Sequence, residues 1–165
     1  MDQSPSLACV VAVMLVGCAT HRKHAVPTAA SSFRCPVTIP NGSHAPGVVT
    51  DSTPIPTSHG NGKIWTVLPI DGKLQITPEK NGSTGAKFPW WKEVPSHLTV
   101  TGRRIDVAAA PLRAWIPPGY GEKFQSTALY FPTSGCWEIS GKAGEAELTF
   151  AVEVTIQTRG PDDGR

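Results

Sequence analysis

Charged residues are scarce in this sequence: Asp, Glu, Lys and Arg make up 17% of its 165 residues, against about a quarter in an average soluble protein. Their balance gives a formal net charge of only +2. This small excess provides no electrostatic basis for binding nucleic acid or an acidic membrane surface. We therefore expect no nucleic-acid partner.

Common catalytic and cofactor motifs are also missing. The sequence contains no G-x-S-x-G, no H-E-x-x-H and no phosphate-binding loop. Beyond the first 32 residues its histidines are His44, His59 and His97, too scattered to indicate a metal site, which needs several ligands on a rigid frame. We predict no catalytic residue, no cofactor and no metal. A hydrolase of unfamiliar type, using for example His97 with a carboxylate, is an alternative.

No segment has a helical period, and proline recurs too often for long helices. The chain contains 16 prolines and 16 glycines. A proline inside a helix removes a hydrogen bond and clashes with the preceding turn. Hydrophobic residues nevertheless make up 39% of the chain, enough for a packed core in one domain of this length. The composition therefore indicates short elements joined by many turns.

Several segments instead have the pattern of β-strands. Residues 64–69 and 73–77 flank Asp71-Gly72, which predicts a hairpin. After a predicted turn at residues 141–144, residues 147–156 alternate apolar and polar side chains, as a half-buried antiparallel strand does. Further candidates are residues 98–101, 124–131 and 136–140.

About seven such strands lie within roughly 125 residues. This number predicts an all-β domain over residues 33–157, an antiparallel β-sandwich of immunoglobulin-like appearance. We expect residues 158–165 to be a disordered tail.

The apolar run at residues 7–16, LACVVAVMLV, indicates export. It is too short to span a bilayer, which takes about 20 residues, and fits the apolar region of a signal peptide. It ends in Leu15-Val16-Gly17-Cys18, which resembles the lipobox of bacterial lipoproteins. The resemblance implies cleavage after residue 17 and acylation of Cys18, with palmitate as a typical acyl chain. Residues 18–32 would then be a flexible tether.

One feature departs from this pattern. The first six residues, MDQSPS, contain no Lys or Arg, whereas signal peptides usually begin with positive charge. Either the start is misassigned or the signal is weak. Plain secretion and a buried hydrophobic helix with an ordinary cysteine are the alternatives to a lipoprotein.

Two cysteines would remain after this processing, Cys35 and Cys136. An oxidising compartment favours a bridge between them, and two free thiols are the alternative. Because Cys136 alternates with Trp137, we expect the bridge to lie outside the core. It would tie residues 34–39 to the penultimate strand.

Six stretches resemble a family of small exported bacterial proteins, many of them lipoproteins, with no assigned activity. The resemblance covers about residues 35–154. It implies a genuine fold outside the cytoplasm and transfers no functional residue. The stretches are CPVTIPNG (35–42), GNG (60–62), WTVLP (65–69), KFPWW (87–91), PPGYG (117–121) and GCWEI (135–139).

The stretch KFPWW raises the question of where its second tryptophan lies. Successive side chains of a strand point to opposite faces, so Trp90 and Trp91 cannot both enter one core. The second ring is either covered by a proline-rich loop such as residues 116–121, or exposed as a stacking surface for a sugar or a partner. Arginines nearby would add hydrogen bonds or cation–π contacts, or else form a solvated strand edge. The candidate contact residues are Trp90, Trp91, Trp115, Tyr120, Arg103 and Arg113.

Together these patterns predict a non-enzymatic binding or interaction module, anchored to a bacterial membrane through Cys18 and facing the cell envelope. Its partner would be an envelope protein or a cell-wall glycan. A glycan-binding protein that uses an exposed tryptophan is the first alternative, and the hydrolase is the second.

Overall fold

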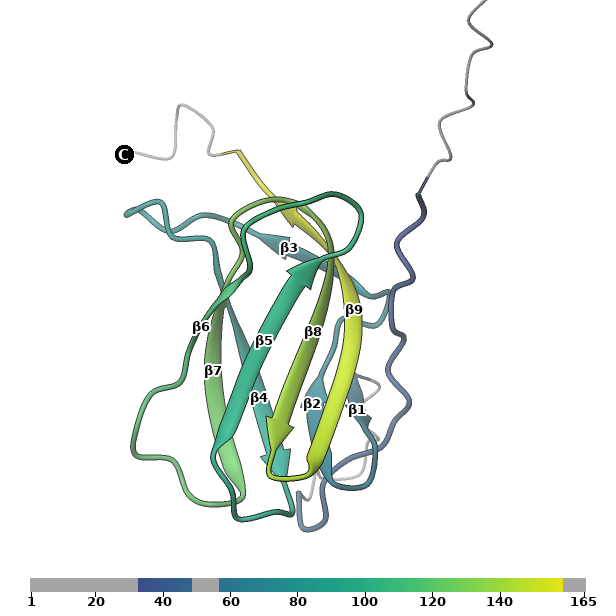
Figure 1. Cartoon of the computed structure of the whole chain (residues 1–165), viewed down its shortest axis with the longest axis vertical. Coiled ribbons are helices and arrows are strands. Elements are labelled where there is room, and N and C mark those ends of the chain that lie inside the picture. Colours follow the sequence, from purple (N-terminus) through teal and green to yellow (C-terminus); the bar gives the residue numbers. More distant parts are fainter. Residues whose placement is uncertain (1–32, 49–56, 159–165) are drawn as a thin grey trace, which may run out of the picture. The chain divides into compact units, whose positions relative to one another are not determined.

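The computed structural model describes residues 33–48 and 57–158. These residues form two β-sheets packed face to face, as the sequence predicts (Figure 1). The described part of the chain contains no helix, and hence none that is long and apolar enough to cross a membrane. The strands are β1 (Ser58–Gly60), β2 (Ile64–Val67), β3 (Lys73–Ile76), β4 (Gly85–Lys92), β5 (Leu98–Arg104), β6 (Arg113–Trp115), β7 (Phe124–Tyr130), β8 (Gly135–Ala143) and β9 (Ala146–Ile156).

The strand order matches that of an immunoglobulin domain. One sheet has the order β1-β2-β4-β7-β6 and the other has β3-β9-β8-β5. Strands β2, β4, β7 and β6 take the places of strands A, B, E and D, and β9, β8 and β5 those of G, F and C. The prediction of an antiparallel sandwich is confirmed with one exception, because β3 runs parallel to β9.

The predicted hairpin around Asp71-Gly72 is wrong. A turn does form there, with the Gly72 amide donating to the Pro69 carbonyl at 3.0 Å. However, β2 already pairs with β1 on one side and β4 on the other, so it has no free edge for β3. The chain therefore crosses to the other sheet, where β3 pairs with β9.

The predicted turn at residues 141–144 begins too early. Strand β8 continues to Ala143, and the chain reverses at Gly144 and Glu145, where Gly144 has a φ of 57°. Gly141 lies within the strand, and it has no side chain at a point where the ring of Trp90 occupies that space. A Cβ atom on Gly141 would lie 2.4 Å from that ring.

Alternating side chains of both sheets fill the core between them. On β9 alternation predicts that Leu148, Phe150, Val152, Val154 and Ile156 share one face; the first four are buried in the core, and Ile156 is partly buried against it. Phe150 packs against Trp90 of the opposite sheet, with ring centroids 5.8 Å apart. The large apolar side chains that cross this interface hold the two sheets together.

A disulfide fixes the start of the described N-terminal segment (residues 33–48) to the outer side of the second sheet, and the segment then reaches β1 of the first sheet, where the Gly42 amide donates to the Ser58 carbonyl at 2.9 Å. Cys35 is bonded to Cys136 on β8, which is the penultimate strand and faces away from the core. Thr38 continues this attachment, since its amide donates to the Ala151 carbonyl at 2.8 Å. The predicted pairing is confirmed, whereas Cys18 lies outside the described residues.

Candidate functional site

The two adjacent tryptophans face opposite sides of β4. Trp90 has no exposed surface, and its Nε1 donates to Thr127 Oγ1 at 3.1 Å within the core. Trp91 lies on the outer face of the five-stranded sheet and is half-buried. Trp90 is therefore a core residue that cannot contact a ligand. Trp91 is partly accessible and can do so.

The register of the sheet places other aromatic residues beside Trp91. Trp91 pairs with Trp65 on β2 and with Phe124 on β7, so the three side chains share the outer face. The ring of Phe124 lies 5.3 Å from that of Trp91 and 5.4 Å from that of Tyr120. The loop at residues 116–121 thus supplies a ring to this row without burying Trp91 completely.

Trp65, at the other end of the row, is covered. It is 4% exposed, and its Nε1 donates to Ser43 Oγ in the N-terminal segment at 3.0 Å. Gly60, its partner on β1, leaves space for the ring. The accessible part of the row therefore extends from Trp91 to Tyr120, which is 44% exposed.

Two further aromatic residues, Trp115 and Tyr130, lie on the same outer face. Trp115 on β6 pairs with Ala128, and Arg113 pairs with Tyr130. The guanidinium group of Arg113 lies 3.9 Å from the centre of the Tyr130 ring, a cation–π contact that orders both side chains. Trp115 is 53% exposed, the most exposed of the described tryptophans.

Small side chains separate the two aromatic groups. Pro89, Ser126 and Ala128 face outward between them, and Lys87 stands beside Ala128. A surface with accessible rings at both ends thus lies across β4, β7 and β6. We call it the aromatic face, and it consists of Trp91, Phe124, Tyr120, Trp115 and Tyr130.

The arginines predicted from the sequence are separated by the fold. Arg113 belongs to the aromatic face. Arg103 lies on the outer face of the other sheet, where its guanidinium group binds Glu138 at 2.8 Å. Arg103 therefore does not join the surface around Trp91.

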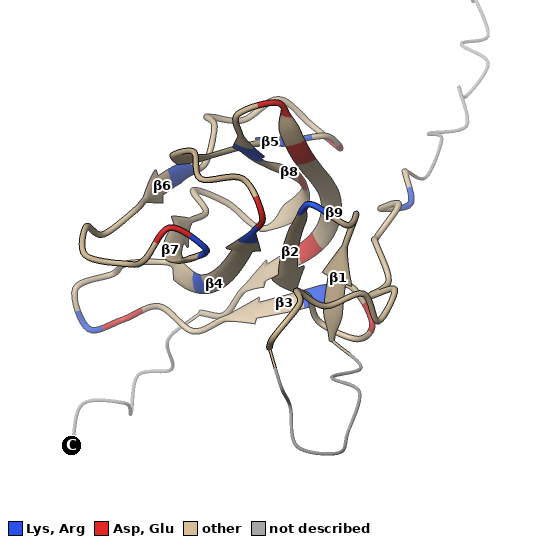
Figure 2. Ribbon diagram, turned by 90° about the horizontal axis from the view of Figure 1, so that it is seen from below, with Lys and Arg blue, Asp and Glu red and all other residues tan. Residues whose placement is uncertain are grey.

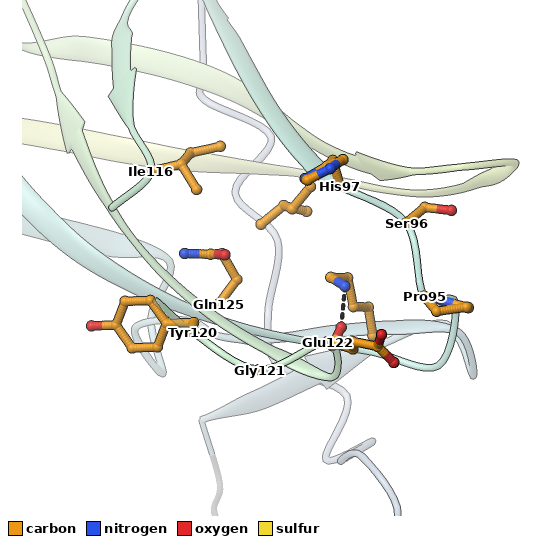
Figure 3. A pocket seen from close by; sticks show the side chains of 10 residues that line it. Pro95, Ser96, His97, Ile116, Tyr120, Gly121, Glu122 and Gln125 are labelled. Carbon is orange, nitrogen blue, oxygen red and sulfur yellow. Dashed lines mark hydrogen bonds between the residues drawn. The ribbon is translucent and has the colours of Figure 1, made fainter. Parts of the chain in front are cut away.

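A cavity of about 260 Å³ opens at the end of the sandwich where β4 ends and β7 begins. Seen from this end, the positions of Lys and Arg along the ribbon are interspersed with those of Asp and Glu (Figure 2). His97 and Glu122 both line the cavity, but no hydrogen bond or ion pair joins them among the described residues (Figure 3). Tyr120 belongs both to this cavity and to the aromatic face.

The remaining polar groups give little sign of metal chemistry. Within residues 33–48 and 57–158, no three His, Cys, Asp or Glu side chains are grouped so as to hold a metal ion. His59 lies in β1, where burial lowers the pKa of its imidazole. Its Nδ1 is buried and has no hydrogen-bond partner.

Sequence reasoning missed two residues of the aromatic face, Phe124 and Tyr130. The predicted strand at residues 124–131 does contain the necessary pattern, because Phe124, Ser126, Ala128 and Tyr130 alternate onto one face. Lys92 also lines the end cavity, but no pattern in the sequence indicates that this lysine is buried.

Comparison with known proteins gives no relative from which a function could be transferred. No protein-family model matches the chain. A search of curated proteins also finds no significant match.

Proposed function

We propose that this protein is a non-catalytic binding module of the bacterial cell envelope, and that it holds a glycan on the aromatic face. The observation that carries the proposal is the exposure of Trp115 on a regular strand, with Tyr130, Phe124 and Trp91 on the same face. Isolated exposed apolar residues are ordinary, but a group of rings on one face indicates a contact surface.

The chemistry of the face supports a sugar as the ligand. Aromatic rings stack on the apolar side of a sugar, and their place on strands limits the entropy lost on binding. Lys87 and Arg113 stand among the rings and supply hydrogen-bond donors for hydroxyl groups.

Recognition through a sheet edge is less well supported. The edge strands β1 and β6 have three residues each and β3 has four, whereas β5, the other edge of the second sheet, has seven, of which Gly102 accepts a hydrogen bond from the Leu112 amide. Thr38 hydrogen bonds with β9 at Ala151, where β3 no longer pairs with that strand. The three short edges offer few free backbone groups to a partner strand, so β5 is the edge at which such recognition would have to occur.

Location at the envelope rests on the lipobox-like sequence before Cys18. Acylation there would anchor the protein, and two or more acyl chains would make the attachment stable. Intact mass of the protein from a membrane fraction should show acyl chains on Cys18. An unlipidated, uncleaved chain would contradict the anchor.

The binding proposal is tested by incubating the full-length protein with insoluble cell-wall material and a panel of polysaccharides. Trp115→Ala should weaken binding roughly tenfold or more, because truncating an aromatic residue that anchors a ligand costs about 2 kcal/mol or more. Phe33→Ala is a matched control, since Phe33 is 52% exposed and lies outside the aromatic face. Equal losses in both variants, or no glycan binding by the parent, would contradict the proposal and direct the search to a protein partner.

A further inference from the structure

The cavity at the end of the sandwich contains a buried positive charge. Lys92 is the last residue of β4 and is 6% exposed. Its side chain lines the cavity together with Tyr120, Gln125 and His97 (Figure 3). A buried ammonium group is costly unless hydrogen bonds and an opposite charge compensate for its lost hydration.

The protein supplies only part of this compensation. The Lys92 ammonium donates to the backbone carbonyl of Glu122 (dashed line in Figure 3) and to that of Val94 at 3.5 Å. An ammonium group has three N–H donors, so one remains for a further acceptor. Among the described residues no carboxylate forms an ion pair with Lys92.

Nearby acidic groups do not supply the missing charge. Glu93 lies 3.9 Å from Lys123, outside the cavity. Glu122 lines the cavity but is an exposed residue, and it approaches Lys92 through its backbone carbonyl. The acceptor that completes the Lys92 site therefore has to be water or a bound anion.

We infer that this cavity binds the carboxylate group of a small hydroxylated acid, such as a uronic acid, through Lys92. Its volume of about 260 Å³ lies just below the range of about 300–1,000 Å³ of pockets for drug-sized ligands, which limits the ligand to a molecule as small as one sugar. The hydroxyls of Ser96 and Tyr120 offer hydrogen-bonding groups for a ligand, and Ile116 offers an apolar wall. Gln125 offers its Oε1 as an acceptor, since its Nε2 already donates to two backbone carbonyls.

A monoanion fits better than a phosphate. A phosphate monoester carries about −1.5 to −2 charges near neutral pH and is usually held by several donors or an arginine fork. This cavity has one lysine, no arginine and a carboxylate of Glu122 in its lining. The site is separate from the proposed use of the aromatic face, although Tyr120 adjoins both.

The inference is tested by ¹H–¹⁵N NMR of the full-length protein titrated with glucuronate, glucose or inorganic phosphate. Glucuronate should shift the backbone amides of Leu98, Gly121 and Gln125, whereas glucose, which lacks the carboxylate, should bind at least about tenfold more weakly. Absence of cavity shifts with glucuronate, equal binding of glucose, or tighter binding of phosphate would each overturn the assignment.

Variants separate the role of Lys92 from a general charge effect. Lys92→Met should weaken glucuronate binding at least about tenfold, whereas Lys123→Met, which removes the same charge from an exposed site at this end, should leave it nearly unchanged. Glu122→Gln should strengthen binding, because it removes a negative charge that repels the glucuronate carboxylate. This variant remains informative if Lys92→Met fails to fold. Unchanged affinity in Lys92→Met, or weaker binding in Glu122→Gln, would contradict the inference.

Discussion

At the residue scale, the packing of Trp90 depends on the missing side chain of Gly141. The Trp90 ring is fully buried and lies where a Cβ on Gly141 would be. Neither residue reveals this contact in the sequence, because they lie on strands of opposite sheets. The glycine at position 141, which looks like part of a turn in the sequence, instead makes room for the Trp90 ring.

Gly141→Ala should destabilise the protein by about 1–3 kcal/mol, the usual cost of overpacking a core. The free energy of unfolding from urea denaturation measures this change. Gly121→Ala is the control, since a Cβ there would contact nothing within 4 Å and the change should have little effect. Equal stability of the two variants would contradict the described contact.

Asp106 provides a residue-scale prediction for acid pH. Its carboxylate accepts two hydrogen bonds from the guanidinium group of Arg104, at 2.7 and 2.9 Å. This interaction lowers the pKa of Asp106 from 3.8 to about 2. Because the folded-state pKa is the lower one, the pair stabilises the fold above pH 3.8, and this contribution is lost as the pH falls toward 2.

Urea denaturation between pH 5 and pH 2 should therefore show a loss of stability in the parent that is smaller in Asp106→Asn. Glu138→Gln is the comparison, because the Arg103–Glu138 pair is more exposed and such pairs contribute little. Parallel pH curves for the parent and Asp106→Asn would contradict the prediction.

At the scale of elements, the bridge between Cys35 and Cys136 holds the N-terminal segment in place. The two cysteines are 101 residues apart in sequence. Closing a loop of that length stabilises a fold by on the order of 4–5 kcal/mol in the chain-entropy account. The segment also covers Trp65 through Ser43, so it protects one end of the aromatic row.

Replacing both cysteines with alanine should lower the thermal midpoint and speed amide hydrogen exchange at Thr38 and Ala151. The amides that bond β8 to β9 should exchange at a less altered rate, because the pairing of these strands from Gly135 to Ala143 does not involve the N-terminal segment. Thr38→Val, which removes only the bond from the Ala151 amide, should cost about 1 kcal/mol. A double cysteine variant as stable as the parent would contradict this role.

Elements with a clear period could be predicted from the sequence, whereas their partners could not. The strand at residues 147–156 and its inward side chains follow directly from alternation. The hairpin at Asp71-Gly72 failed because a local turn signal does not reveal that β2 has both edges occupied. Strand pairing depends on distant residues, which a local pattern does not contain.

At the scale of the whole molecule, the aromatic face exists only after folding. Its rings come from three strands and one loop, spread from Trp91 to Tyr130. Alternation separates Trp90 from Trp91, but only the register of the sheet brings Phe124 beside Trp91 and Ala128 beside Trp115. Arg113 joins the face because β6 belongs to this sheet, whereas Arg103 lies on β5 in the other sheet.

The five tryptophans of the chain offer the most direct test of this account. Labelling the full-length protein with 5-fluorotryptophan gives one ¹⁹F signal per residue, which single substitutions assign. Two of these residues, Trp90 and Trp137, are fully buried, and Trp65 is covered. Solubilised cell-wall glycan should shift the signals of Trp115 and Trp91 and leave those of Trp90 and Trp137 in place. A glycan that binds without moving Trp115 or Trp91 would show that the aromatic face is not the binding surface.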